Sequence, residues 1–463
     1  MNNETILKIN KRSFITVCII LSSFMALAYL LTFIINKGTY ENLDYIVIEG
    51  KGYSLVKFIF APIRLLTSSD GLIIIVISLF ILVLGGAFNV MDKTNGIYAL
   101  IAYLINKFKE KKYTLMYLVI LFFMLFGSLF GIFEESVTLL PIIILLSLSL
   151  GWDTFVGFCM CVMAAGFGFS TALTNPFSIG LASEKMGITV VDGIWYRIII
   201  FILMYILLCT FLTLHVKQIE KDPKKSITYE EDQIKIKNLN LNEFREYNPK
   251  VLKAYIILYL FILAVILACS IIEPLNGYTT PILAVSFLVG VFICGRAIGY
   301  KFKEIGKMFL DGVISISPAI VLIMLAGSIK FILEDAKIMD TIIYNLSKLL
   351  NNTSPIVGIL FIYAIILFIQ FFIGSASAKV ILIISIISNL ATKINITQNI
   401  ALLAFVFGDG YTDLIYPTNP VLLISLGMAG ISYTKWVKKT IILQILLLLI
   451  TSILLIIGYY IGY

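Results

Sequence analysis

The sequence predicts an all-α polytopic membrane protein made of two inverted-topology repeats with re-entrant hairpins and broken transmembrane helices. The 463 residues are 60% hydrophobic and 13% charged, whereas soluble domains carry about 25% charged residues. The chain contains repeated apolar runs close to the roughly 20 residues that a helix needs to cross a bilayer. At that length the chain can hold about ten to thirteen helical segments. Thr-Asn-Pro ends a glycine-rich apolar run twice, at 174–176 and 418–420, which indicates two related halves.

The first apolar run, residues 14–35, is expected to be a retained span. It is too long for the hydrophobic part of a signal peptide and has no small-residue cleavage site. Lys8, Lys11 and Arg12 precede it, and basic residues flank spans on the cytoplasmic side. We therefore expect a multi-pass protein of the cytoplasmic membrane with its N-terminus inside.

Further elements follow in order. Residues 58–66, with Lys57 and Arg64, predict an amphipathic helix at the membrane interface. Full spans are expected at 72–90 and 113–130.

The longest hydrophilic stretch divides the chain almost at its midpoint. It is too polar for hydrocarbon, and lysines crowd both of its ends, so we expect it on the cytoplasmic side. The predicted organisation is a first transmembrane repeat at 1–216, a cytoplasmic linker at 217–251, a connecting transmembrane helix at 252–278 and a second, inverted repeat at 279–463.

A constant spacing supports the internal repeat. Asp92 and Asp335 follow similar glycine-containing segments and lie 243 residues apart, and Asn175 and Asn419 lie 244 apart. Lysines follow the span at 72–90, whereas charges of both signs follow its counterpart at 314–329. The positive-inside rule then predicts opposite orientations for the two repeats and an outside C-terminus.

Two regions, at 132–192 and 373–436, are interrupted by glycine or proline every ten to fifteen residues. Short apolar pieces with such interruptions are expected for re-entrant hairpins and unwound helices. Irregular backbone at membrane depth is tolerated only when it is buried in protein or lines a cavity.

The Thr-Asn-Pro motifs predict a binding site. Pro176 and Pro420 lack an N–H and leave carbonyls unpaired. Those carbonyls and the polar side chains suit a small hard cation such as Na⁺, and the helix that starts after each break suits a carboxylate. A proline kink satisfied by neighbouring helices is the alternative, but two copies in register favour a site. The candidate ligands are Thr174, Asn175, Thr418 and Asn419, with Na⁺ at Asn175 and Asn419.

Charged residues near the breaks extend the candidate site. Glu134 and Glu135, followed by Ser136, would bind a substrate ammonium or guanidinium group or carry protons; a hydrated interfacial position is the alternative. Lys379 takes the place of Ser136 in the second repeat. It would form an ion pair with Glu135, bind a substrate carboxylate together with Ser375 and Ser377, or stand in for a bound Na⁺; a snorkelling lysine is the alternative.

Asp409 and Asp413 precede the second motif. Gly408 and Gly410 flank Asp409 and permit close approach, and residues four apart share a helical face. We expect one of the two carboxylates to bind a cation or a proton. The alternative is a polar kink packed against tyrosines.

Several of these segments resemble the YfcC-type family, which belongs with the anaerobic C4-dicarboxylate carriers and arginine/ornithine antiporter-like proteins of the ion transporter superfamily. The resemblance lies in 127–136 with Pro141, in 374–379 and in 407–418, and it covers nearly the whole chain. It implies inverted repeats with two re-entrant hairpins, a carrier coupled to an ion or to exchange, and an inner-membrane protein that is often dimeric. Lys379 stands where glutamine is usual.

Together these observations predict a secondary active transporter of a small carboxylate-bearing solute. Four acidic groups against one basic group favour an amino acid such as arginine or ornithine; a C4-dicarboxylate or other organic anion is the alternative. An ion channel or an intramembrane enzyme is a remote alternative, because the single histidine, His215, is expected at the interface and no nucleophile–base motif is present. The expected partners are the solute, Na⁺ or H⁺ as coupling ion, the bilayer and a second copy of the chain, with no cofactor, metal centre or nucleic acid.

Overall fold

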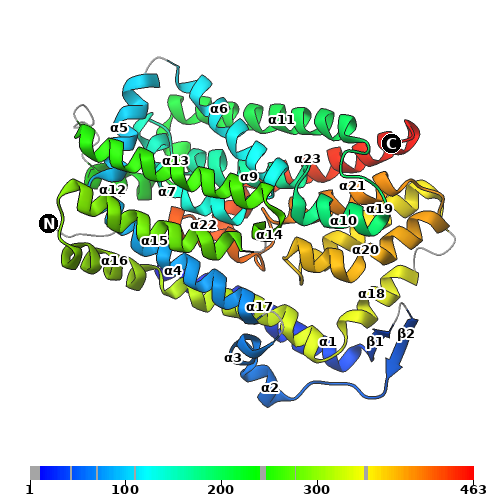
Figure 1. Cartoon of the computed structure of the whole chain (residues 1–463). Coiled ribbons are helices and arrows are strands. Elements are labelled where there is room, and N and C mark those ends of the chain that lie inside the picture. Colours follow the sequence, from blue (N-terminus) through cyan, green and yellow to red (C-terminus); the bar gives the residue numbers. More distant parts are fainter. Residues whose placement is uncertain are drawn as a thin grey trace.

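The computed structural model describes residues 11–41, 44–68, 71–108, 111–239, 247–276, 278–348 and 353–463. They form an elongated bundle of helices with one small β-hairpin (Figure 1). Within these described ranges, eight helices are long and apolar enough to cross a membrane, or nine if one bent pair counts as a single span, and four shorter apolar helices accompany them. The predicted all-α membrane fold with broken helices is therefore confirmed.

The first half begins with the three predicted spans, which are α1 (Lys11–Ile34), α4 (Gly71–Lys93) and α6 (Lys112–Leu125). Helix α5 (Gly96–Phe108), which was not predicted, lies between α4 and α6 in the sequence. The segment 58–66, predicted as one interfacial helix, is divided among the short elements α2 (Leu55–Ile59), α3 (Ala61–Arg64) and η1 (Leu65–Thr67). The apolar side chains of Leu55, Val56 and Ile59 are exposed, and the position at the membrane interface stays a prediction.

A β-hairpin between α1 and α2 was not predicted. Strands β1 (Lys37–Glu41) and β2 (Asp44–Ile48) pair antiparallel with Lys37 opposite Ile48. The hairpin packs on α18 (Met339–Lys348), and the Tyr45 ring stacks on Tyr344 with ring centroids 3.9 Å apart. The β-branched run at 46–48 was the available signal, since such residues favour strands.

The rest of the first half is interrupted where glycine and proline predicted breaks. After the π-helical turn η2 (Phe126–Phe130), the elements are η3 (Glu134–Thr138), α7 (Leu140–Ser149), α8 (Thr154–Phe158), η4 (Cys159–Met163), α9 (Ala164–Ser170), η5 (Pro176–Gly180), α10 (Leu181–Met186) and the long α11 (Ile194–Lys221). The linker then holds η6 (Pro223–Lys225) and α12 (Tyr229–Leu239), while its residues 240–246 lie outside the described part of the chain.

The second half follows the connecting helix α13 (Pro249–Ile271) and the short α14 (Glu273–Asn276). Its elements are α15 (Thr279–Ile298), α16 (Phe302–Ile316), α17 (Pro318–Asp335), α18, α19 (Pro355–Gln370), α20 (Ala376–Lys393), α21 (Gln398–Thr412), α22 (Pro420–Ala429) and α23 (Tyr433–Tyr460). The span predicted at 314–329 is α17, which is bent by 41° from α16 at Pro318, where proline removes a backbone donor.

The two halves repeat the same order of long and broken helices, and their contacts are reciprocal. Helix α1 packs on α17 as α15 packs on α4, α10 packs on α20 as α22 packs on α7, and α6 packs on α9 as α19 packs on α21. Such reciprocity is expected of a duplicated fold. The head-to-foot orientation of the repeats and the domain boundaries stay predictions.

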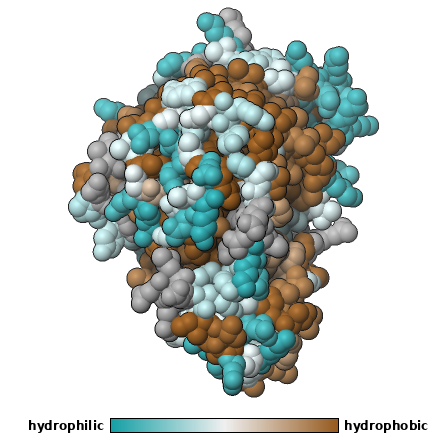
Figure 2. Space-filling model, turned by 90° about the vertical axis from the view of Figure 1, so that its right-hand side faces the viewer, coloured by the Kyte–Doolittle hydropathy of each residue, from teal (hydrophilic) through white to brown (hydrophobic). Residues whose placement is uncertain are grey.

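The ends of the bundle differ in what they carry. Helix α23 finishes at the same end as the β-hairpin, whereas α12 lies at the other end (Figure 1). Figure 2 views the hairpin end, where hydrophilic side chains gather over the middle of the face and hydrophobic ones lie along its sides. The assignment of this end to the outside stays a prediction, and the N-terminal residues 1–10 lie outside the described residues.

Candidate binding site at the helix breaks

Four interruptions of the helices hold all the predicted binding residues or lie directly beside them. We name these interruptions break A (131–133), break B (171–175), break C (371–375) and break D (413–419). Breaks A and B belong to the first half, and breaks C and D belong to the second.

Break B is fastened to the π-helical turn at the end of α6. The carbonyl of Ser128 accepts the N–H groups of Leu173 at 2.9 Å and of Thr174 and Asn175 at 3.2 Å. The Ser128 hydroxyl donates to the Thr171 carbonyl at 2.8 Å, and the Thr174 hydroxyl donates to the Leu129 carbonyl at 2.9 Å. The break thus finds protein partners for backbone groups that water cannot reach.

Asn175 is fully buried at the start of η5, followed by Pro176 at the first helical position. Its Oδ1 accepts the Phe177 N–H at 2.9 Å, while its Nδ2 has no partner among the described residues. Gly131 of break A has φ +70°, and a Cβ there would lie 2.3 Å from Asn175 Oδ1, so only glycine fits. A buried donor without an acceptor costs about 1–3 kcal/mol, which favours a ligand or water oxygen beside Asn175.

Asn419 holds break D together. Its Oδ1 accepts the Val421 and Leu422 N–H groups at 2.8 and 3.3 Å, and its Nδ2 donates to Asp413 Oδ1 at 2.7 Å. Gln370 Nε2 donates to the same oxygen at 2.8 Å. Sequence reasoning missed Gln370, although it is the one polar side chain in the apolar α19 besides Tyr363.

The Lys379 ammonium group lies at break C and is completely buried. Its Nζ is 2.5 Å from Asp409 Oδ1, and it donates to the carbonyls of Ile373 at 3.0 Å and Gly374 at 3.4 Å. The predicted ion pair with Glu135 is therefore wrong, because Lys379 pairs within its own half. The burial also excludes a snorkelling lysine.

Glu134 and Glu135 follow break A. The Glu134 side chain is exposed and that of Glu135 is partly exposed. Neither makes an ion pair with a residue that the structure describes, and Glu134 is near enough to Asp413 for their charges to interact.

The remaining predicted residues have local partners or partial exposure. Ser136 Oγ donates to the Phe133 carbonyl at 2.6 Å, and Ser375 Oγ accepts the Ala378 N–H at 3.4 Å at the start of α20. Ser377 and Thr418 are partly exposed, and Pro420 begins α22.

The two halves meet at these breaks. A Cβ on Gly410 of α21 would lie 2.4 Å from the Ser170 backbone, and one on Gly166 of α9 would lie 2.7 Å from the Leu414 side chain. In addition, η5 packs on α20 and η3 packs on α22. The structure thus brings the predicted residues of both halves into one region, as a shared site requires, while their binding roles stay predictions.

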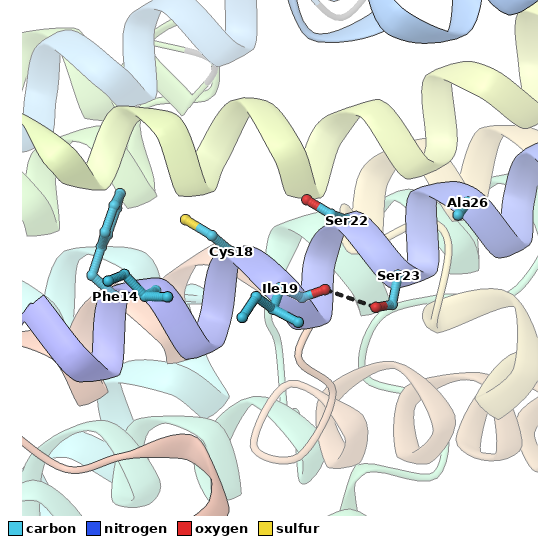
Figure 3. A pocket seen from close by; sticks show the side chains of 7 residues that line it. Phe14, Cys18, Ile19, Ser22, Ser23 and Ala26 are labelled. Atoms are coloured by element: carbon cyan, nitrogen blue, oxygen red, sulfur yellow. Dashed lines mark hydrogen bonds between the residues drawn. The ribbon is translucent and has the colours of Figure 1, made fainter.

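A groove along α1 is separate from this chemistry. It has a volume of about 460 Å³ and is lined by seven residues between Phe14 and Ala26. Figure 3 shows that the hydroxyl of Ser23 bonds back to the carbonyl of Ile19 in the same helix, at 2.8 Å. The groove contains none of the predicted binding residues, so we do not place the site there.

The linker helix α12 docks against the turn between α7 and α8. Asp232 accepts the Thr154 N–H at 2.9 Å and the Thr154 and Thr228 hydroxyls, and Lys235 donates to Thr154 Oγ1 at 2.9 Å and to the Ala429 carbonyl at 2.7 Å. Lys235 therefore connects the turn between α7 and α8 to the end of α22. Burial raises the pKa of the Asp232 carboxyl and lowers that of the Lys235 ammonium group.

The only histidine is part of the same region. His215 is buried, and its Nε2 lies 2.9 Å from Asp153 Oδ2. The ring is thus buried in the protein against a carboxylate, while its expected position at the membrane interface stays a prediction. Asp153 itself caps α8 by accepting the Val156 N–H at 2.8 Å.

Replacing Asp232 with alanine is expected to release α12. The Thr154 N–H and two hydroxyls lose their acceptor, whereas Asp232→Asn keeps an oxygen in place and removes a charge that burial disfavours. Hydrogen exchange of the α12 amides should accelerate about tenfold or more in Asp232→Ala, since a buried unsatisfied group costs about 1–3 kcal/mol, and change little in Asp232→Asn. Wild-type exchange rates in Asp232→Ala would show that these bonds do not hold the helix.

Comparisons with known proteins identify the family of the chain. The model of a family described as C4-dicarboxylate anaerobic carrier matches residues 13–460. An uncharacterised protein of Haemophilus influenzae is 29% identical over 386 residues, which cover 82% of this chain and 75% of that protein. A putative basic amino acid antiporter of Escherichia coli, YfcC, is 25% identical over 401 residues, which cover 84% and 78%.

Two solved structures are also similar over most of their length. The YdaH transporter of Alcanivorax borkumensis has a TM-score of 0.44 at 17% identity and covers 96% of this chain and 99% of its own. MtrF of Neisseria gonorrhoeae, described with a class of antimetabolite efflux pumps, has a TM-score of 0.47 at 15% identity and covers 96% of each. On the family match over nearly its full length, the chain belongs to the C4-dicarboxylate anaerobic carrier family of membrane transporters.

Proposed function

We propose that the protein is a secondary active transporter for a small solute that carries both a carboxylate and a positive charge, such as arginine or ornithine. The observation that carries this proposal is that Glu134 and Glu135 are accessible and have no basic partner among the described residues, while Lys379 is already neutralised by Asp409.

The charge balance of the breaks favours a cationic group on the solute. Lys379 and Asp409 neutralise each other, and Asp413 is held by two neutral amide donors. Glu134 and Glu135 add negative charge without a basic partner in the described residues. Carboxylates away from bulk water bind cations or protons, so an ammonium or guanidinium group suits this place.

The carboxylate of the solute needs hydrogen-bond donors. Asn175 Nδ2 is a buried donor without an acceptor in the described part of the chain, and Ser375 and Ser377 offer hydroxyls at the partly exposed start of α20. Because Oδ1 of Asn175 is already occupied by the Phe177 N–H, its free group suits an anionic oxygen better than Na⁺. This supports an amino acid bound between the halves.

A C4-dicarboxylate is the second candidate because the family description names this class. It would bring two negative charges to a region with Glu134, Glu135 and Asp413, and Lys379 is not free to bind it. A dicarboxylate therefore requires protonated glutamates or a rearranged Lys379, which makes it the weaker candidate.

Uptake into proteoliposomes tests the proposal. Vesicles preloaded with unlabelled arginine should accumulate labelled arginine with saturation and trans-stimulation, which a channel does not show. Arginine and ornithine should compete, whereas succinate and fumarate should not; competition by the dicarboxylates alone would overturn the substrate class. The panel is run with and without Na⁺ and with a pH gradient, which identifies the coupling ion.

Replacing Glu135 or Glu134 with glutamine is expected to lower arginine uptake about tenfold or more, because hydrogen bonds to charged groups contribute about 1.5–3 kcal/mol. Glu184→Gln is the matched control, since Glu184 is an exposed acidic residue of α10. Wild-type uptake in both Glu134→Gln and Glu135→Gln would contradict the assignment of the cationic group.

A further inference from the structure

We infer that break C and Asp409 of α21 form a cation site whose occupant is the protein's own Lys379 ammonium group. The site therefore takes no Na⁺ from solution. The inference deepens the proposed function by stating that this site of the second half contributes no coupling Na⁺. It rests on the proposed function only for this statement about transport stoichiometry.

The ligand set around Lys379 Nζ is that of a small hard cation. One carboxylate oxygen, from Asp409, lies at 2.5 Å, and two main-chain carbonyls, of Ile373 and Gly374, lie at 3.0 and 3.4 Å. Carboxylate and main-chain carbonyl oxygens are ligands that proteins use for hard cations. All three partners found for this nitrogen in the described residues are oxygen atoms.

The backbone at break C explains why a cation belongs there. Helix α19 ends at Gln370, and the carbonyls that follow it have left the helical hydrogen-bond pattern. The carbonyls of Ile373 and Gly374 accept no backbone N–H among the described residues, so they are free to bind a cation. Asp409 adds a carboxylate from α21, so three oxygen atoms converge where the ammonium group lies.

Lys379 reaches this place by folding back. It lies in the first turn of α20, and its Nζ bonds to carbonyls five and six residues earlier in the chain. Lys379 is 0% exposed, and its partner Asp409 is 1% exposed. The ammonium group is thus enclosed by protein and not directed at a solute.

The first half differs at the matching position. Ser136 also reaches back to its break, where its hydroxyl donates to the Phe133 carbonyl at 2.6 Å, but it brings no charge. An attached cation is therefore particular to the second half. Because a covalently attached cation cannot cross the membrane with the solute, this site adds no Na⁺ to the transport stoichiometry.

Equilibrium binding of ²²Na⁺ to the purified full-length chain tests the inference without any solute. Relative to wild type, Lys379→Gln should bind about one additional Na⁺ per chain, because its site has lost the attached cation while Asp409 and the carbonyls remain. The double variant Lys379→Gln with Asp409→Asn should lose that gain, and Lys393→Gln, at an exposed lysine of the same helix, should bind as wild type does. No gain in Lys379→Gln overturns the inference.

Thermal unfolding gives a second readout. Na⁺, compared with K⁺ at equal ionic strength, should raise the Tm of Lys379→Gln above any shift seen in wild type, because a ligand that binds only the folded state stabilises it. If Lys379→Gln gives little folded protein in K⁺, purification in Na⁺ should restore it, and equal failure in both salts also overturns the inference. No solute is present in these measurements, so the expected Na⁺ binding is the same whether the protein carries an amino acid or a dicarboxylate. Conversely, failure to find additional Na⁺ in Lys379→Gln would not change the proposed substrate class.

Discussion

Replacing Asn419 with alanine is expected to abolish uptake while the protein is still produced and inserted. The side chain is at once a donor to Asp413 and an acceptor for the first N–H groups of α22. Its loss removes one of two donors to a buried carboxylate and uncaps the helix. Each buried unsatisfied group costs about 1–3 kcal/mol, and loss of a helix cap costs about 1 kcal/mol, so the start of α22 should leave its position. Uptake per amount of reconstituted protein measures the effect.

Two further variants make this result specific. Asn389→Ala removes the same amide from an exposed position of α20 and should transport normally. Asn175→Ala should also abolish uptake, because it removes the acceptor for Phe177 N–H and the buried donor of break B. Normal uptake in both Asn175→Ala and Asn419→Ala would remove the assignment of the site to the paired motifs.

The spans and the breaks could be predicted because each depends on local physical chemistry. Apolar runs of membrane-crossing length became α1, α4, α6 and α13, and the prolines at 176 and 420 begin helices after breaks. Proline acts through its own missing N–H and fixed φ, so its effect is visible without knowledge of the neighbours. The recurrence of the two motifs then indicated that the halves correspond.

Partners across the bundle could not be predicted in the same way. Lys379 binds Asp409 rather than Glu135 because break C lets the side chain fold back across its own helix start, and this depends on the packing of α20 on α21. His215 is buried for a similar reason, since Asp153 comes from a turn 62 residues earlier. Both outcomes depend on tertiary packing, to which one sequence gives no access.

The α6–α9 contact that supports break B depends on direct backbone approach. A Cβ on Gly168 would lie 2.0 Å from the Met124 carbonyl oxygen, and one on Gly127 would lie 2.2 Å from the Ala165 carbonyl oxygen. Small residues allow helices to approach closely in membranes, where packing replaces the hydrophobic effect as the driving force. The same approach places the Ser128 carbonyl against the three N–H groups of break B.

Gly168→Ala is therefore expected to destabilise the fold more than any exposed substitution. The new methyl group meets backbone, which cannot rotate away, and overpacking costs about 1–3 kcal/mol in addition to the break B hydrogen bonds that separate with the helices. We expect a lower Tm and a smaller monodisperse peak in size-exclusion chromatography. Gly306→Ala is the matched control, because a Cβ at Gly306 of α16 meets nothing within 4 Å and alanine favours helix by about 1 kcal/mol over glycine. A wild-type Tm for Gly168→Ala would show that the two helices do not approach so closely and that break B is held by other contacts.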